Sequence, residues 1–111
     1  MAALLIAEHN NSNLKVYTLN AITAASKIDK EVDVLVAGNK CENVVKEVAK
    51  VSLVRKVLHS ESPDYENFLA ENLSPLIVKL ADKYTYIISS ANTFGKNFMP
   101  RVAALLDTSQ I

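Results

Sequence analysis

The hydrophobic residues of this chain fall into four short runs, and a stretch with helical spacing follows each run. The runs cover residues 3–7, 32–37, 53–58 and 84–89. Near-continuous apolar runs are typical of strands buried on both faces, as in a parallel sheet between layers of helices. Arg55 and Lys56 interrupt the third run. We therefore place that strand at an edge of the sheet, where charged side chains discourage further pairing.

The segments between the runs repeat apolar residues at the spacing of an α-helix. One apolar face consists of Leu19, Ile22 and Ala25, and a second of Val44, Val45, Val48 and Ala49. The longest consists of Phe68, Leu69, Leu73, Leu76, Ile77, Leu80 and Ala81, and the last of Phe98, Val102, Leu105 and Leu106. This alternation predicts an α/β fold, with an open, mostly parallel sheet and helices on both faces.

Pro75 interrupts the longest helical pattern. Either Ser74 caps a new helix in which Pro75 is the first residue, or a longer helix kinks at Pro75. We favour a kinked or two-part helix. In the last helical segment, Pro100 is compatible with a helix only within the first turn.

Length and charge narrow the classes of function. The 111 residues predict a single domain that covers 1–111. Twelve basic residues balance twelve acidic ones and are scattered, so we expect no attraction to nucleic acid or to an anionic membrane. The first apolar run is too short for a membrane span and lacks the basic start of a signal peptide.

The single cysteine and the two histidines give no strong catalytic or metal-binding motif. Cys41 fits a reducing compartment, and without a histidine nearby in sequence it is interpreted as an inert surface or boundary cysteine rather than a reactive thiol. Glu8 and His9 follow the first strand, and His59 is placed after the third, so no metal-ligand spacing emerges. We interpret Glu8 and His9 as a solvated loop pair or an interface hydrogen bond, and expect no catalytic residue and no metal site.

Two polar loops lie where ligands approach an open α/β sheet, at the carboxyl ends of its strands. They are residues 8–13 and residues 90–97. The second loop has Gly95 and Lys96 before a predicted helix, which are components of an anion site. Neither loop has the glycine spacing of a phosphate-binding loop. We favour a polar loop used for domain packing over phosphate binding.

Longer stretches of the sequence resemble one family. LIAEH at residues 5–9 and TLNAITAA at 18–25 resemble the opening of electron transfer flavoprotein alpha subunits. VAG at 36–38, followed by Cys41, is similar to a further stretch of that family, and the most specific match is FGKNFMPRVAALLD at 94–107. The resemblance covers essentially the whole chain.

The resemblance implies the amino-terminal domain of an alpha subunit, with an adenine-nucleotide alpha-hydrolase-like (Rossmann-like) fold and the strand order 3-2-1-4. In that family the alpha subunit pairs with a beta subunit. The heterodimer uses FAD to carry electrons from acyl-CoA and related dehydrogenases of fatty acid beta-oxidation to a membrane oxidoreductase. A separate carboxy-terminal domain of alpha chiefly holds the FAD, and we expect this chain to be a fragment without it.

From this resemblance we expect part of an electron carrier rather than an enzyme, with no cofactor-binding residue and no FAD bound to this chain alone. The implied location is the bacterial cytoplasm, or the mitochondrial matrix for a processed eukaryotic parent.

The rival hypothesis is a stand-alone nucleotide-binding module of the universal-stress-protein type, which usually has a glycine-rich phosphate loop late in the chain. A small hydrolase is disfavoured because no nucleophile–base pair stands out. We also expect self-association through the apolar edge of the fourth strand, unless residues 108–111 shield it.

Overall fold

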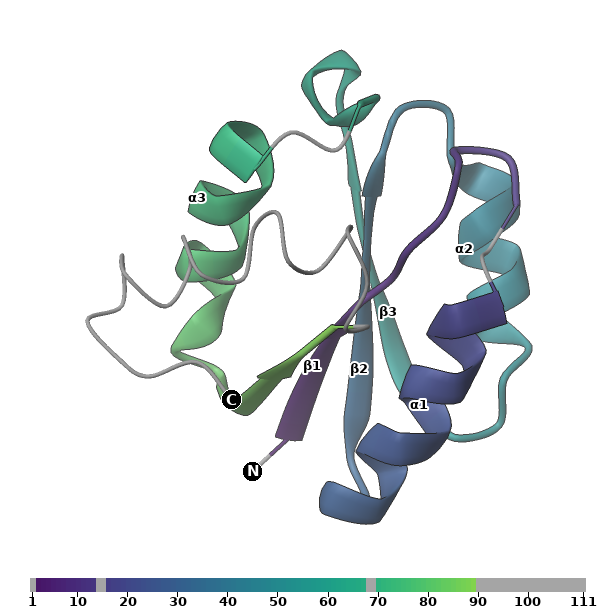
Figure 1. The fold of residues 1–111 in the computed structure, drawn as a ribbon, viewed down its shortest axis with the longest axis vertical. Helices are drawn as coiled ribbons and strands as arrows, with labels where there is room; N and C mark the ends of the chain where they lie inside the picture. Colours follow the sequence, from purple (N-terminus) through teal and green to yellow (C-terminus); the bar gives the residue numbers. More distant parts are fainter. Residues whose placement is uncertain (1, 14–15, 68–69, 90–111) are drawn as a thin grey trace.

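A computed structural model describes residues 2–13, 16–67 and 70–89. Four parallel strands form one sheet in the order β3-β2-β1-β4 (Figure 1). The strands are β1 (Ala2–Ile6), β2 (Val32–Gly38), β3 (Val54–Glu61) and β4 (Tyr84–Ile88), and the helices are α1 (Val16–Ile28), α2 (Glu42–Ala49), the short 3-10 helix η1 (Pro63–Tyr65) and α3 (Ala70–Ala81). The fold class, the four predicted strands and the strand order 3-2-1-4 are therefore confirmed.

The two central strands explain the near-continuous apolar runs. Every residue of β1 and β2 is buried, because helices cover both faces of these strands. β3 and β4 lie at the two edges of the described sheet and are only partly buried. The edge position predicted for the strand that contains Arg55 and Lys56 is confirmed. The expected self-association through β4 remains a prediction.

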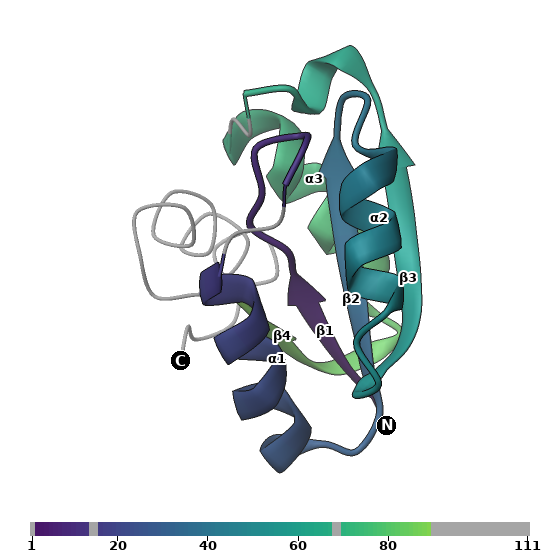
Figure 2. The same ribbon diagram turned by 90° about the vertical axis from the view of Figure 1, so that its right-hand side faces the viewer.

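Helices lie on both faces of the sheet, as the alternation predicts. α1 and α2 cover one face and α3 covers the other, as the two views in Figures 1 and 2 show. The core under α1 and α2 contains Leu5, Ala7, Ile22, Ala25, Val32, Val34, Val36, Cys41, Val44 and Val48. The core under α3 contains Leu4, Ile6, Leu35, Ala37, Leu73 and Ile77. Neighbouring strand residues thus point to opposite cores, and only a layered fold can bury both sets.

Pro75 lies inside α3, which is one continuous helix from Ala70 to Ala81. The favoured two-part helix, in which Ser74 caps a new helix, is therefore wrong, because both residues lie in the middle of one helix. A kink at Pro75 stays a prediction. Proline there removes one backbone hydrogen bond of the helix. Leu73 and Ile77, on either side of it, are buried against the sheet, whereas Pro75 faces solvent. The apolar contacts of α3 therefore outweigh the local cost of proline.

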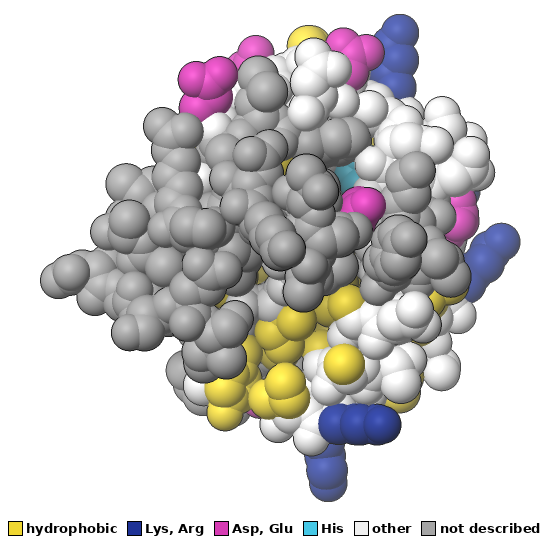
Figure 3. Space-filling model, in the orientation of Figure 1, with side chains coloured by type: hydrophobic (Ala, Val, Ile, Leu, Met, Phe, Trp, Pro, Cys, Tyr) yellow, Lys and Arg dark blue, Asp and Glu magenta, His cyan; other side chains and the backbone are white. Residues whose placement is uncertain are grey.

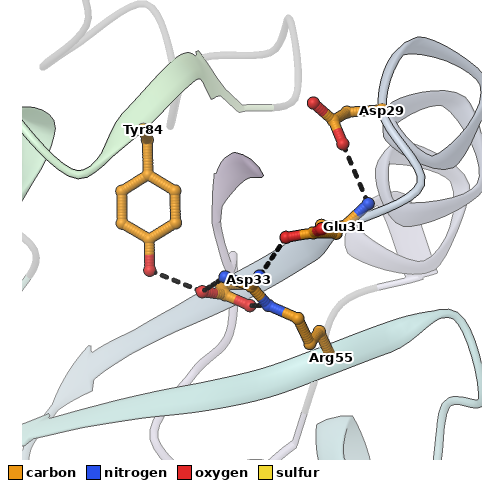
Figure 4. A network of polar contacts seen from close by, with 5 residues as sticks. All are labelled: Asp29, Glu31, Asp33, Arg55 and Tyr84. Atoms are coloured by element: carbon orange, nitrogen blue, oxygen red, sulfur yellow. Dashed lines mark hydrogen bonds and ion pairs between the residues drawn. The ribbon is translucent and has the colours of Figure 1, made fainter. Parts of the chain in front are cut away.

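A buried carboxylate connects three strands near their amino ends (Figure 4). The side chain of Asp33 in β2 is fully buried and accepts hydrogen bonds from Arg55 in β3, with Nε to Oδ1 at 2.9 Å and Nη2 to Oδ2 at 2.8 Å. The hydroxyl of Tyr84 in β4 donates to Oδ2 at 2.6 Å. Arg55 also pairs with Glu31. Arg55 is therefore not only an edge charge: it compensates a carboxylate that the sequence places inside an apolar run.

The protonation of this network follows from its contacts. Burial alone would raise the pKa of Asp33, but the hydrogen bonds from Arg55 and Tyr84 outweigh it and lower that pKa below its ordinary value. Burial, together with the hydrogen bond to Asp33, raises the pKa of Tyr84 to about 12. Asp33 is thus ionised and Tyr84 protonated at neutral pH, which is the combination that the three hydrogen bonds require.

The surface of the described residues agrees with the balanced composition. On the face shown in Figure 3, the lysine and arginine side chains lie at the rim, two of them together at the bottom, and form no basic stripe. In the described part of the chain, no helix has the length and hydropathy that a membrane span requires.

Candidate functional site

The loop after β1 reaches across the carboxyl end of the sheet to β2. His9 is buried, with 3% of its surface exposed. Its Nε2 lies 2.8 Å from the carbonyl oxygen of Ala37, and its Nδ1 accepts a hydrogen bond from the backbone N–H of Asn11 at 2.9 Å. Because a carbonyl can only accept, Nε2 holds the proton and the imidazole is neutral. The interpretation of His9 as part of a solvated loop pair is therefore wrong, because the ring joins two strand ends inside the protein.

Asn11 links this loop to two other segments. Its Oδ1 accepts from the backbone N–H of Asn39 at 2.8 Å, and its Nδ2 donates to the carbonyl of Glu66 at 3.0 Å. Asn11 has a positive φ of 71°, which asparagine tolerates better than most residues. Asn11 thereby connects the ends of β1 and β2 to the segment after η1.

Gly38 at the end of β2 allows this loop to lie close to the sheet. A Cβ atom at this position would lie 2.6 Å from both Asn11 Oδ1 and His9 Cε1. Glycine is needed here for space and not for a left-handed backbone, since its φ is not positive. The side chains of His9 and Asn11 therefore occupy the carboxyl end of β2, where a ligand approaches in many open α/β folds.

The buried histidine predicts a pH dependence of stability. Burial lowers the pKa of His9 below its ordinary value of 6.5, although the hydrogen bond to Ala37 partly opposes this. The unfolded chain therefore takes up a proton before the folded one does. The stabilisation from neutral His9 is complete above pH 6.5 and is lost as the pH falls towards the lowered pKa of the folded protein.

We expect the free energy of unfolding to decrease below that pH, with a slope that approaches about 1.4 kcal/mol per pH unit for one proton. Urea denaturation between neutral and mildly acidic pH measures this slope. The His9→Gln variant should lose this slope. An unchanged slope in His9→Gln would show that another group is responsible.

Cys41, His59 and Glu61 form a second polar cluster at the same end of the sheet. Cys41 is the residue before α2 and is fully buried, and its Sγ lies 3.4 Å from His59 Nε2. Glu61 Oε1 lies 3.3 Å from the same nitrogen. The prediction of a boundary cysteine is confirmed, but the thiol is buried and a histidine is its neighbour in space. His59 lies within β3 and not after it, which corrects its predicted position.

Sequence reasoning missed this cluster because Cys41 and His59 are 18 residues apart. One signal was available in the sequence: His59 and Glu61 are two residues apart, so in a strand they share a face. The register that pairs Glu61 with Gly38, close to Cys41, comes only from the structure. Burial raises the pKa of the Cys41 thiol, and Glu61 adds to this effect. The thiol therefore stays protonated and is a poor nucleophile, as an inert cysteine requires.

The other predicted features lie outside the described residues. These are the loop of residues 90–97, with Gly95 and Lys96, and the last predicted helix, with Phe98, Pro100, Val102, Leu105 and Leu106. Anion binding by that loop remains a hypothesis.

Comparison with known proteins decides the family. The family model for the electron transfer flavoprotein domain matches residues 3–111. The chain belongs to this family. The resemblance of the motifs at residues 5–9, 18–25 and 94–107 is thereby confirmed, and the rival hypothesis of a stand-alone universal-stress-type module is not favoured.

Several curated relatives in this family are named as alpha subunits. The chain is 49% identical over its whole length to the electron transfer flavoprotein subunit alpha of Pseudomonas aeruginosa, and covers 36% of that protein. It is 51% identical, over 97% of the chain, to the mitochondrial alpha subunit of Dictyostelium discoideum and covers 33% of it. For the probable mitochondrial alpha subunit of Caenorhabditis elegans the identity is 41%, over 99% of the chain and 34% of the relative. The chain thus spans about a third of the length of these relatives.

Proposed function

We propose that this chain is the amino-terminal structural and subunit-interaction domain of an electron transfer flavoprotein alpha subunit. The observation that supports this most directly is the high identity to alpha subunits along the whole chain, over only a third of their length. The complete alpha subunit would pair with a beta subunit and use FAD to carry electrons. The donors would be acyl-CoA and related dehydrogenases, and the acceptor a membrane oxidoreductase of the respiratory chain.

The carboxyl end of the described sheet supports a role in structure rather than in cofactor binding. His9 and Asn11 use their polar atoms for contacts within the chain and lie against Gly38, the only glycine in the described residues. A nucleotide pyrophosphate needs glycine-rich backbone that it can approach closely. We infer that the FAD of the complete protein lies against other parts of it, and that this chain acts as a scaffold and not as an enzyme.

The relatives are bacterial and mitochondrial proteins, which supports the cytoplasm or the mitochondrial matrix as the location of the parent. A single cysteine, buried and without a disulfide, agrees with a reducing compartment.

Binding to the beta subunit tests this function. We expect the chain to bind a purified, free beta subunit with one-to-one stoichiometry, because the proposed role of the domain is to contact that subunit. Isothermal titration calorimetry measures the stoichiometry and the affinity. Full-length alpha subunit should compete with the chain, and a preassembled alpha–beta heterodimer is the control that should not bind it. Absence of binding to the free beta subunit, or equal binding to the heterodimer, would contradict the proposal.

A further inference from the structure

Three side chains with metal-binding atoms meet where β2, α2 and β3 come together. Cys41 Sγ lies 3.4 Å from His59 Nε2, and His59 Nε2 lies 3.3 Å from Glu61 Oε1. The three atoms all lie within 4.8 Å of one another. A tetrahedral Zn²⁺ ion with ordinary bond lengths to sulfur, nitrogen and oxygen holds its ligand atoms about 3.3–3.6 Å apart. The Sγ–Nε2 and Nε2–Oε1 separations match this spacing, and the third pair, Sγ and Oε1, lies within 4.8 Å.

The cluster places two groups on one imidazole nitrogen. If Nε2 has a proton, it can donate to Glu61, and the sulfur of Cys41 can then act only as a weak second acceptor. If Nε2 has no proton, the thiol can donate to it, but Glu61 then has no donor on that nitrogen. Neither tautomer gives both contacts a strong hydrogen bond. A cation at the centre would attract all three atoms at once.

The backbone holds the three ligands in place. His59 and Glu61 alternate with Ser60 in β3, so the strand directs both towards the face that α2 covers. Cys41 precedes α2, its thiol makes no capping hydrogen bond to the helix, and its backbone N–H donates to Glu61 Oε1 at 3.3 Å. The thiol is buried, whereas the side chains of His59 and Glu61 are 33% and 38% exposed. An ion can therefore enter from solvent and reach a sulfur atom that the fold already positions.

We propose that Cys41, His59 and Glu61 form a binding site for a divalent cation of the zinc class. One sulfur, one nitrogen and one oxygen ligand suit Zn²⁺ better than Mg²⁺ or Ca²⁺, which prefer oxygen ligands alone. With three protein ligands, a tetrahedral ion keeps one position for water. On binding, the S–H bond of Cys41 breaks, the sulfur–metal bond forms, and the proton leaves to solvent.

The same residues do not suit a nucleophilic triad. In such a triad the carboxylate orients the histidine through the ring nitrogen that does not face the nucleophile. Here Glu61 and Cys41 both face Nε2. Both contacts are to the same ring nitrogen, so the three side chains do not form a relay.

Titration with Co²⁺ tests the site on the untagged 111-residue chain. We expect one Co²⁺ per chain, with the near-ultraviolet charge-transfer band of a cobalt–thiolate bond and the visible bands of tetrahedral cobalt. Added Zn²⁺ should remove these bands, and excess Mg²⁺ should not. Calorimetry in buffers of different ionisation enthalpy should show proton release on binding of Zn²⁺.

Variants identify the ligands. Cys41→Ser should abolish the charge-transfer band. His59→Gln and Glu61→Gln should each weaken Zn²⁺ binding at least about tenfold, because loss of a residue that only hydrogen-bonds to a metal ligand already weakens binding about 10–100-fold. Glu42→Gln is the matched control and should bind normally, because Glu42 is next to Cys41 but outside the cluster. His59 and Glu61 lie on an edge strand with exposed side chains, so these two variants keep the test decisive if Cys41→Ser does not fold. Absence of Co²⁺ and Zn²⁺ binding, or binding that survives both His59→Gln and Glu61→Gln, would overturn the proposal.

Discussion

Replacing Leu5 by alanine should lower the free energy of unfolding by about 2–5 kcal/mol. Leu5 is fully buried in β1, which lies between β2 and β4 in the sheet. Its side chain packs in the core under α1 and α2, together with Ile22 and Val34. Alanine would leave a cavity there, because strands on both sides prevent β1 from moving to fill it. Urea denaturation at neutral pH measures the loss.

The control for this variant is Leu19→Ala, which removes the same atoms from α1. Leu19 is 42% exposed, so we expect a change of only about 0.5 kcal/mol. If the two variants lost equal stability, the assignment of β1 to the centre of the core would be wrong.

Gly38→Ala should destabilise the chain by about 2–4 kcal/mol, combining the cost of overpacking with that of one or two weakened hydrogen bonds. The new methyl group would lie 2.6 Å from Asn11 Oδ1 and from His9 Cε1. Neither side chain can move away freely, because Oδ1 accepts from Asn39 and the imidazole bonds to Ala37 and to Asn11. We also expect the pH dependence due to His9 to become weaker, since its buried hydrogen bonds are strained. Thermal and urea denaturation at two pH values measure both effects.

Lys40→Gly provides the matched control in the same turn. Lys40 is exposed and has a positive φ of 54°, a conformation that glycine adopts without strain. This variant should keep the stability of the chain or raise it by up to about 1 kcal/mol. A Gly38→Ala variant as stable as the original chain would show that the loop after β1 does not pack against β2 as described.

The domain architecture followed from local pattern. Apolar runs of strand length, separated by segments with helical spacing, predicted the α/β fold, and the charges of Arg55 and Lys56 placed β3 at an edge. These inferences succeeded because a strand or helix buries residues at a fixed period, which can be counted along the chain. The order of the strands and the family came from the resemblance, because periodicity alone does not determine which strands are neighbours.

Other features depend on groups that are distant in sequence. Pro75 favours the end of a helix locally, but the burial of Leu73 and Ile77 against the sheet keeps α3 continuous. In the sequence, Asp33 is a charged residue inside an otherwise apolar run. Only the arrangement of the strands in the sheet brings Arg55 and Tyr84 within hydrogen-bond distance of it.

The polar end of the sheet is the clearest case of this difference. The sequence by itself placed His9 in a loop at the carboxyl end of the first strand and predicted Cys41 to be a surface or boundary cysteine. Only the tertiary structure decided that His9 is buried against Ala37 and that Cys41 meets His59 and Glu61. The physical reason is that contacts between parallel strands depend on register and on the path of the connecting helices. Both are set by packing of the whole domain, and neither can be read from the spacing of the residues that meet.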